Sequence, residues 1–336
     1  MPDNPLISIL MTVKDEAPFL HQCLDSIRDQ TERHWELIMM DDISSDGSEK
    51  IMAEYAAADP RMKLFPGKGL GVIPGVREAY RHSSGQLITR IDGDDYMSLQ
   101  KLERLKAIAL EHGPGTLATG LTRCFADDGL GEGWNRYELW LNDLNRREAN
   151  WTGIYKECVV ASSCWMVYRQ DLDGCESFVD ERYPEDYDLA FRFYRYGLKV
   201  KTCPEYLHHW RDHPVRISRT LDHYADQRYY ALKMRYFFEI DRREASPLVV
   251  WGAGRNGKDL ALLLQKMGKS FTWTCDNPRK WGHTIYGQKI VDPAFLESEK
   301  DPQILVAVSG REIVGTLKTR LEAMGFQANQ QFFLLF

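Results

Sequence analysis

The sequence lacks the features that mark secreted and membrane-spanning proteins. Its 7 cysteines are scattered and include no Cys-x-x-Cys pair, so neither a disulfide framework nor a zinc site is indicated and a reducing compartment is expected. No basic segment followed by an apolar one stands at the start, and no apolar run approaches ~18 residues, so neither a signal peptide nor a transmembrane helix is predicted. We expect a cytoplasmic protein, and peripheral contact with the inner face of a membrane stays open.

A strong charge bias is also absent. The 43 lysine and arginine residues and the 49 aspartate and glutamate residues leave a formal net charge of −6, which gives no support for nucleic-acid binding. Hydrophobic residues make up 43% of the 336 positions and charged residues 27%. This composition is ordinary for a soluble globular protein, and the length suits about two domains.

The first hundred residues alternate between strand and helix patterns. Strands are predicted over residues 6–13, 37–40, 62–65 and 87–91. Helices are predicted from residue 18 to 29 and in two further segments that end near residues 57 and 82. This alternation favours a doubly wound, mostly parallel sheet, in which ligands bind at the carboxyl ends of the strands.

Acidic residues gather where these strands end. Residues 92–95, Asp-Gly-Asp-Asp, follow the fourth strand and form an Asp-x-Asp motif, and Asp15 and Asp42 fall at the same edge. Clustered carboxylates on a tight turn suit a hard divalent cation, because Mg²⁺ or Mn²⁺ takes one or two protein carboxylates and keeps its other positions for water and phosphate oxygens. The motif by itself is equally compatible with an acidic surface turn.

Several spaced segments resemble family 2 glycosyltransferases of the GT-A fold. Residues 7–48 resemble the nucleotide-binding start of that family, and residues 87–105 resemble its metal-binding motif. Acceptor-side segments follow in the family's order at residues 162–172, 183–200 and 208–218. The resemblance implies an inverting, metal-dependent enzyme that transfers a sugar from a nucleotide diphosphate sugar, expected to be UDP-linked, to a glycan or lipid-linked hydroxyl acceptor in surface polysaccharide synthesis.

The resemblance also assigns donor-side roles to individual residues. Asp94 is expected to bind Mn²⁺ or Mg²⁺ directly, with Asp92 and His213 beside it. The nucleotide-sugar-binding residues that it implies are Thr12, Asp15, Asp42, Arg77, Asp92 and Arg211. Family members often have Pro and Asn where Thr12 and Asp15 stand, and Asn where Arg77 stands.

A second pair of carboxylates, Glu185 and Asp186, opens an amphipathic helical pattern. Carboxylates at a helix start interact favourably with the helix dipole, which is the simplest explanation of the pair. The resemblance implies that Asp186 is the catalytic base, which takes the proton of the acceptor hydroxyl during a single displacement with inversion. Glu185 is the alternative base or a residue that orients the acceptor.

The last ninety residues carry a different pattern. A strand at 248–251 runs into Gly-Ala-Gly-Arg-Asn-Gly, a helix to about residue 267, and a strand over 271–275 that ends at an aspartate. This order predicts a smaller Rossmann-like α/β domain with a candidate second nucleotide site. Its residues are Gly252, Gly254, Gly257 and Asp276. The glycines are equally explained by the tight turn and close helix packing alone.

The predicted organisation is a glycosyltransferase domain at 1–225, a helical linker at 226–246 and the Rossmann-like domain at 247–336. Because the resemblance ends before Pro247, residues 1 to about 240 are expected to fold alone. An amphipathic insert at 129–150 is expected to form an acceptor lid or a partner surface.

Three other functions are compatible with parts of this pattern. A nucleotidyltransferase would also use carboxylate-bound metal, but it needs a glycine-rich basic loop near the N-terminus, which Val-Lys-Asp-Glu-Ala-Pro-Phe is not. An NAD-dependent oxidoreductase would use the C-terminal motif and leave the acidic clusters without a role. A lectin-like module would bind sugar without turnover.

Overall fold

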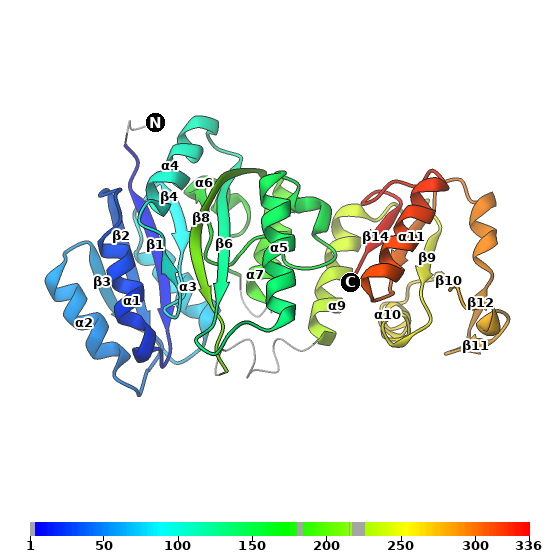
Figure 1. Cartoon of the computed structure of the whole chain (residues 1–336), viewed down its shortest axis with the longest axis horizontal. Coiled ribbons are helices and arrows are strands. Elements are labelled where there is room, and N and C mark those ends of the chain that lie inside the picture. The colour runs from blue at the N-terminus through cyan, green and yellow to red at the C-terminus, as the bar shows by residue number, and fades with distance from the viewer. Residues whose placement is uncertain (1–3, 180–183, 215, 217–225) are drawn as a thin grey trace. The chain divides into compact units, whose positions relative to one another are not determined.

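The computed structural model describes residues 4–179, 184–214, 216 and 226–336 (Figure 1). The chain forms two compact units, one of residues 1–151 and 159–224 and the other of residues 152–158 and 225–336. The predicted linker therefore falls in the second unit, together with a short segment from the middle of the sequence. No helix among the described residues is long and apolar enough to cross a membrane.

The first unit is built on an eight-stranded sheet. Its strands, in spatial order, are β3 (Met62–Pro66), β2 (Trp35–Asp41), β1 (Ile7–Val13), β4 (Leu87–Arg90), β7 (Trp165–Tyr168), β6 (Thr116–Phe125), β8 (Lys199–Arg211) and β5 (Tyr96–Met97). The first four are parallel, as predicted. The other half is mixed, because β7 runs antiparallel to β4 and β6, and β5 runs antiparallel to β8. The strand–helix alternation that predicted a mostly parallel sheet ends at β4. The directions of the later strands did not follow from this alternation.

The helices of this unit are α1 (Ala17–Arg28), α2 (Ser48–Ala58), α3 (Val72–His82), α4 (Lys101–His112), α5 (Glu132–Arg146), α6 (Arg169–Gly174) and α7 (Glu185–Tyr196). In Figure 1, α2 and β3 lie at one edge of the sheet. Strands β1, β2 and β4 are nearly continuous buried runs, as expected for strands covered on both faces. Helix α3 packs on β1 and β2, and α4 packs on β6, β7 and β8. The parallel strands β1, β2 and β4 end on the same side, which places their following loops together.

The insert at 129–150 forms α5, and its buried face is unusually polar. Asn142 donates to the carbonyl of Thr122 and accepts from its amide, at 2.8 and 2.9 Å. Asn145 donates to the carbonyl of Gly120 at 3.0 Å. These contacts lie where the pairing of β6 with β8 shifts register. This face of α5 therefore supports an irregular part of the sheet, a role that the prediction of a lid or partner surface did not include.

The second unit has its own six-stranded sheet, which is mostly parallel. Its strands, in spatial order, are β11 (Thr284–Ile285), β12 (Gln288–Val291), β10 (Thr272–Thr274), β9 (Leu248–Trp251), β13 (Gln303–Val306) and β14 (Phe332–Leu334). All neighbours are parallel except β11 and β12. Its helices are α9 (Asp226–Tyr236), α10 (Arg255–Lys266) and α11 (Arg311–Ala323).

Candidate active site

Asp95 anchors the acidic turn after β4 to strand β8. This carboxylate is 1% exposed; it is hydrogen-bonded to Nε2 of His208 at 3.0 Å and accepts from the amide of Arg211 at 2.8 Å. Burial and the nearby charges of Asp94 and Asp92 raise the pKa of Asp95 well above its usual value. Asp95 therefore fixes the turn against β8 and does not face a ligand.

Two predicted metal ligands lie side by side. Nε2 of His213 is 3.0 Å from Oδ2 of Asp94, and the His213 ring packs at 4.8 Å from the ring of Phe19. Asp94 is 6% exposed, and its Oδ1 has no hydrogen-bond partner among the described residues. A buried carboxylate oxygen without a partner is costly unless a ligand completes it, so this pair fits a divalent cation.

The same part of the chain offers no larger cluster of ligands. Among the described residues, no three His, Cys, Asp or Glu side chains converge as a metal site. Mg²⁺ or Mn²⁺ shared with substrate phosphates would need only one or two protein carboxylates.

Asp92 lies in a different environment from Asp94. Its Oδ1 is 2.6 Å from Nη2 of Arg90, and its Oδ2 accepts from the hydroxyls of Ser162 and Ser163 at 3.1 Å. Burial raises the pKa of Asp92, but the Arg90 charge and these hydrogen bonds outweigh burial and lower the pKa below its usual value. Asp92 is therefore a charged group supported by Arg90 and two serines, none of which the sequence analysis identified.

Glu16 is a further carboxylate that the sequence analysis did not identify. Burial, followed by the charges of Asp94 and Asp92, raises the pKa of Glu16 well above its usual value. Its Oε2 is buried with no hydrogen-bond partner among the described residues. A Cβ atom at Gly93 would lie 2.1 Å from this oxygen, so the glycine of the Asp-x-Asp motif leaves room for Glu16. The only signal in the sequence is its position beside Asp15 after the first strand.

The predicted donor-binding residues Thr12, Asp42 and Arg77 lie near the end of β1, directly after β2 and on α3. The Oγ1 of Thr12 is buried without a partner among the described residues. Asp42 accepts from the amides of Leu70 at 3.1 Å and Gly71 at 2.9 Å, so its carboxylate holds the glycine-rich loop. Arg77 lies half-buried on α3.

Asp15 is used within the protein. It has a left-handed backbone with φ of +54°, and its Oδ1 accepts from the amide of Ser45 at 2.6 Å. This hydrogen bond lowers the pKa of Asp15. Asp15 therefore ties the loop after β1 to the loop after β2, and its binding role stays a prediction.

Arg211 also makes contacts within the protein. Its Nε donates to the carbonyl of Asp94 at 3.0 Å, and its Nη atoms bind Asp127 and Gln22. The phosphate contact predicted for Arg211 is not tested by this arrangement. Arg216 lies closer to the carboxylate, with Nε 3.8 Å from Oδ2 of Asp94, and was not assigned a role from the sequence.

Glu185 and Asp186, the two candidates for the catalytic base, lie at the start of α7. Oδ1 of Asp186 accepts from the amide of Tyr187 at 2.7 Å. Burial, followed by the charge of Glu185, raises the pKa of Asp186 to about 7, against the opposing effect of Arg90. Such a pKa suits a general base at neutral pH. Asp188, the third carboxylate of this turn, is instead paired with Arg192 at 2.8 Å and fully buried.

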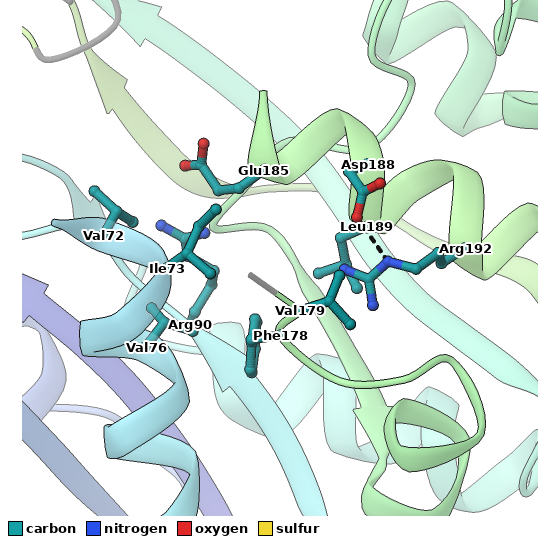
Figure 2. Close-up of a pocket in the computed structure, with 10 residues that line it drawn as sticks. All are labelled: Val72, Ile73, Val76, Arg90, Phe178, Val179, Glu185, Asp188, Leu189 and Arg192. Carbon is teal, nitrogen blue, oxygen red and sulfur yellow. Dashed lines mark hydrogen bonds and ion pairs between the residues drawn. The ribbon is translucent and has the colours of Figure 1, made fainter. Parts of the chain in front are cut away.

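Glu185 and Asp186 face two different pockets. Glu185 lines one between α3 and α7 together with Ile73 and Leu189 (Figure 2). Asp186 lines the other, beside Ser162 and Trp165. Arg90 lines both pockets.

In the second unit, the four residues of the candidate nucleotide site differ in their surroundings. A Cβ atom at Gly257 would lie 1.9 Å from the carbonyl oxygen of Gly252, whereas one at Gly254 would meet nothing within 4 Å. The carboxylate of Asp276 accepts from Nε1 of Trp251 at 2.9 Å and from Nη1 of Arg320 at 3.0 Å. Gly257 is therefore required by helix packing, Gly254 is not, and Asp276 already binds two protein donors.

The chain is similar to known glycosyltransferases over much of its first unit. Residues 8–175 match the family model described as Glycosyl transferase family 2. EpsJ of Bacillus subtilis strain 168, described as an uncharacterized glycosyltransferase, is 25% identical over 241 residues, which cover 68% of this chain and 68% of EpsJ. WfgD of Escherichia coli is 31% identical over 111 residues, 33% of this chain and 43% of WfgD, and is described as UDP-Glc:alpha-D-GlcNAc-diphosphoundecaprenol beta-1,3-glucosyltransferase.

Among solved structures, S. aureus TarS in complex with UDP-GlcNAc has a TM-score of 0.57 to this chain at 14% identity, covering 77% of this chain and 71% of TarS. This likeness supports the GT-A fold alone. The family match includes Thr12, Asp42 and residues 92–95, while Asp186 and His213 lie beyond its end. Because this match spans half of the sequence, the chain belongs to glycosyl transferase family 2 and is a glycosyltransferase.

Proposed function

We propose that this glycosyltransferase is inverting and dependent on a divalent metal, and that it moves a sugar from a UDP-linked donor to a glycan or lipid-linked hydroxyl acceptor in polysaccharide synthesis. One observation carries the proposal. Ser162 donates a hydrogen bond to Asp92 and also lines the pocket that contains Asp186. Ser162 therefore connects a donor-side carboxylate to the pocket that the candidate base lines.

The donor would bind along the loops after the parallel strands. Thr12 has an unused hydroxyl oxygen there, and Asp42 can accept hydrogen bonds from a nucleobase or a ribose. Since Asp42 already accepts from Leu70 and Gly71, the nucleoside would share or replace these contacts. Asp94 and His213 would hold Mn²⁺ or Mg²⁺, which would neutralise charge on the leaving diphosphate.

The acceptor would enter on the side of α7. Its hydroxyl oxygen attacks the anomeric carbon from the face opposite the diphosphate, a carbon–oxygen bond forms, and the bond to the diphosphate oxygen breaks. Asp186 takes the hydroxyl proton, and the anomeric configuration inverts. Because the pKa of Asp186 is raised to about 7, the carboxylate is basic enough to accept this proton while about half of it is ionised at neutral pH.

The substrate classes rest on the described relatives. WfgD is described as using UDP-Glc and a diphosphoundecaprenol-linked acceptor, and TarS is seen with UDP-GlcNAc. A UDP-sugar and a lipid-linked or polymeric glycan are therefore the first substrates to test. The second unit would bind a nucleotide at Gly252, Gly254, Gly257 and Asp276, a separate proposal that rests on the open space at Gly254.

A thermal-shift screen of nucleotide sugars with Mn²⁺ tests the donor. A ligand at ~100 times its dissociation constant should stabilise the protein by about 2.7 kcal/mol. Transfer with the selected donor is then followed by NMR of the product's anomeric proton. A product that keeps the donor's configuration would overturn the inverting mechanism, and binding without turnover would favour a lectin-like role.

A further inference from the structure

Arg90 is a buried cation at the centre of the proposed active site. It is the last residue of β4 and is 4% exposed. Its Nη2 contacts Asp92 at 2.6 Å, while its Nε is buried with no hydrogen-bond partner among the described residues. A guanidinium carries five donors, so the contact of Nη2 with Asp92 leaves capacity for a further anionic or polar group.

The surroundings of Arg90 connect the two ends of the reaction. Figure 2 shows its guanidinium directed toward the start of α7, where Glu185 lies. Arg90 lines the pocket that contains Glu185 and the pocket that contains Asp186. Leu189 also lines both pockets, but it is apolar. Among the described residues, Arg90 is the one that lines both pockets and also forms an ion pair with Asp92.

We propose that Arg90 is a positioning residue that holds Asp92 on the donor side and the Glu185–Asp186 pair on the acceptor side in one arrangement. This inference rests on the proposed function, because it takes Asp186 as the base. Removal of the guanidinium would take from Asp92 its ion pair at 2.6 Å and would take from Glu185 and Asp186 the positive charge of Arg90.

The charge of Arg90 has a direct consequence for the base. The charged groups that face Asp186 are Glu185 on the same helix, Arg90 from β4 and Asp92 from the acidic turn. Glu185 and Asp92 raise the pKa of Asp186, and Arg90 lowers it. Loss of the cation should therefore raise the pKa of Asp186 further. An opposite charge at close range typically changes a carboxyl pKa by about 1–3 units.

The test compares Arg90→Gln with Arg90→Lys in the full-length protein. Transfer is measured from pH 5 to 9 with Mn²⁺ and the donor found by screening. Arg90→Gln should lower turnover about 10–100-fold, as expected for a residue that orients others, and should move the acidic limb of the profile to higher pH. Arg90→Lys should keep the limb near its original position. Arg61→Gln, which removes another ion-paired arginine at the Asp59 contact, is the matched control and should leave the limb unchanged.

A second measurement separates positioning from simple stabilisation. The Asp186 carboxyl is followed by ¹³C NMR in aspartate-labelled protein without metal or donor, with Asp186→Asn to assign the signal. Its titration should move to higher pH in Arg90→Gln. If Arg90 only stabilises the fold, Arg90→Gln will lower the melting temperature but leave both the titration and the pH profile unchanged, and the inference is overturned.

The double variant Arg90→Gln/Asp186→Asn distinguishes a wrong role for Arg90 from a wrong assignment of Asp186 as the base. If Arg90 acts partly through Asp186, Arg90→Gln should cost less turnover in the Asp186→Asn background than in the wild type. Wild-type turnover in Asp186→Asn alone would reject Asp186 as the base, whereas a moved NMR titration in Arg90→Gln would still support the contact between Arg90 and this end of α7.

Discussion

His213 and Asp94 are in contact through Nε2 and Oδ2 at 3.0 Å, although 119 positions of the chain separate them. Both side chains are largely buried. The other carboxylate oxygen of Asp94 is buried without a partner among the described residues. A bound cation would replace the hydrogen bond at Oδ2 and would give Oδ1 the partner that it lacks among the described residues.

Asp94→Ala should abolish transfer and weaken donor binding in Mn²⁺, because it removes the expected direct ligand. The fold should survive, since the residue lies in a turn at a sheet edge. Calorimetric titration of the donor with and without Mn²⁺ measures the effect, and Asp143→Ala on the exposed face of α5 is the control. Transfer that continues in EDTA would contradict the metal requirement.

Asp186→Asn should lower turnover by about 10²–10⁴-fold, the usual contribution of a positioned general base. Donor affinity should be nearly unchanged, because the amide keeps the shape and the proposed role of Asp186 is toward the acceptor. Glu185→Gln should have a smaller effect if Glu185 only orients the acceptor. A larger loss in Glu185→Gln with intact donor affinity would transfer the base role to Glu185.

The stability of the protein should depend on the protonation of Asp186. Its folded pKa of about 7 lies above the ordinary value of 3.8, so the folded state keeps a proton that the unfolded state loses. The stability from the protonated form is fully present below pH 4 and is lost as the pH rises through 7. Asp186→Asn does not titrate and should gain on the order of 4 kcal/mol relative to wild type between pH 4 and pH 8.

Urea unfolding of both proteins at pH 4.5, 6 and 8, without metal or donor, measures this difference. An equal gap between variant and wild type at all three pH values would show that the carboxyl of Asp186 titrates normally.

Tyr155 should be a stability determinant of the second unit. It is 1% exposed, its ring centroid lies 5.3 Å from that of Phe333, and its hydroxyl donates to Asp241 at 2.5 Å. Tyr155→Ala should cost about 3–5 kcal/mol, as large-to-small changes of buried aromatic residues do. Tyr286→Ala, at a half-exposed site in the same unit, should cost less than about 0.5 kcal/mol.

This packing changes the expectation for a shortened chain. The sequence predicts that residues 1 to about 240 fold alone, but such a fragment keeps Tyr155 and Phe237 and removes Phe333, which packs on both. We expect the fragment to melt at a lower temperature and to bind a hydrophobic dye. A fragment as stable as the full chain would show that Tyr155 does not need Phe333 to be buried.

Gly254 and Gly257 should respond differently to substitution. Gly254→Ala should leave the melting temperature unchanged, because a Cβ there meets nothing within 4 Å, and Gly257→Ala should destabilise the unit, because its Cβ would meet a carbonyl oxygen at 1.9 Å. If the second unit binds a nucleotide, Gly254→Val should remove the stabilisation by that nucleotide. No shift with any nucleotide in the wild type would leave the motif a structural one.

The local pattern of the sequence was sufficient for the elements whose signals are short-range. The runs that became β1, β2, β3 and β4 are parallel, and the Gly-x-Gly-x-x-Gly segment joins a strand to a helix in the second unit. Such features follow from residues a few positions apart, because side-chain period and turn geometry are local properties. The family itself could be inferred from these spaced motifs.

The tertiary structure decided the features that depend on distant residues. The direction of β7, the contact of His213 with Asp94 and the support of Asp92 by Ser162 and Ser163 all join separate segments. Glu16 has the sequence context of an ordinary helix start, and only folding places it against Gly93. The surroundings that raise the pKa of Asp186 arise in the same way, since burial and neighbouring charge are properties of the folded chain and are not encoded by any one short stretch.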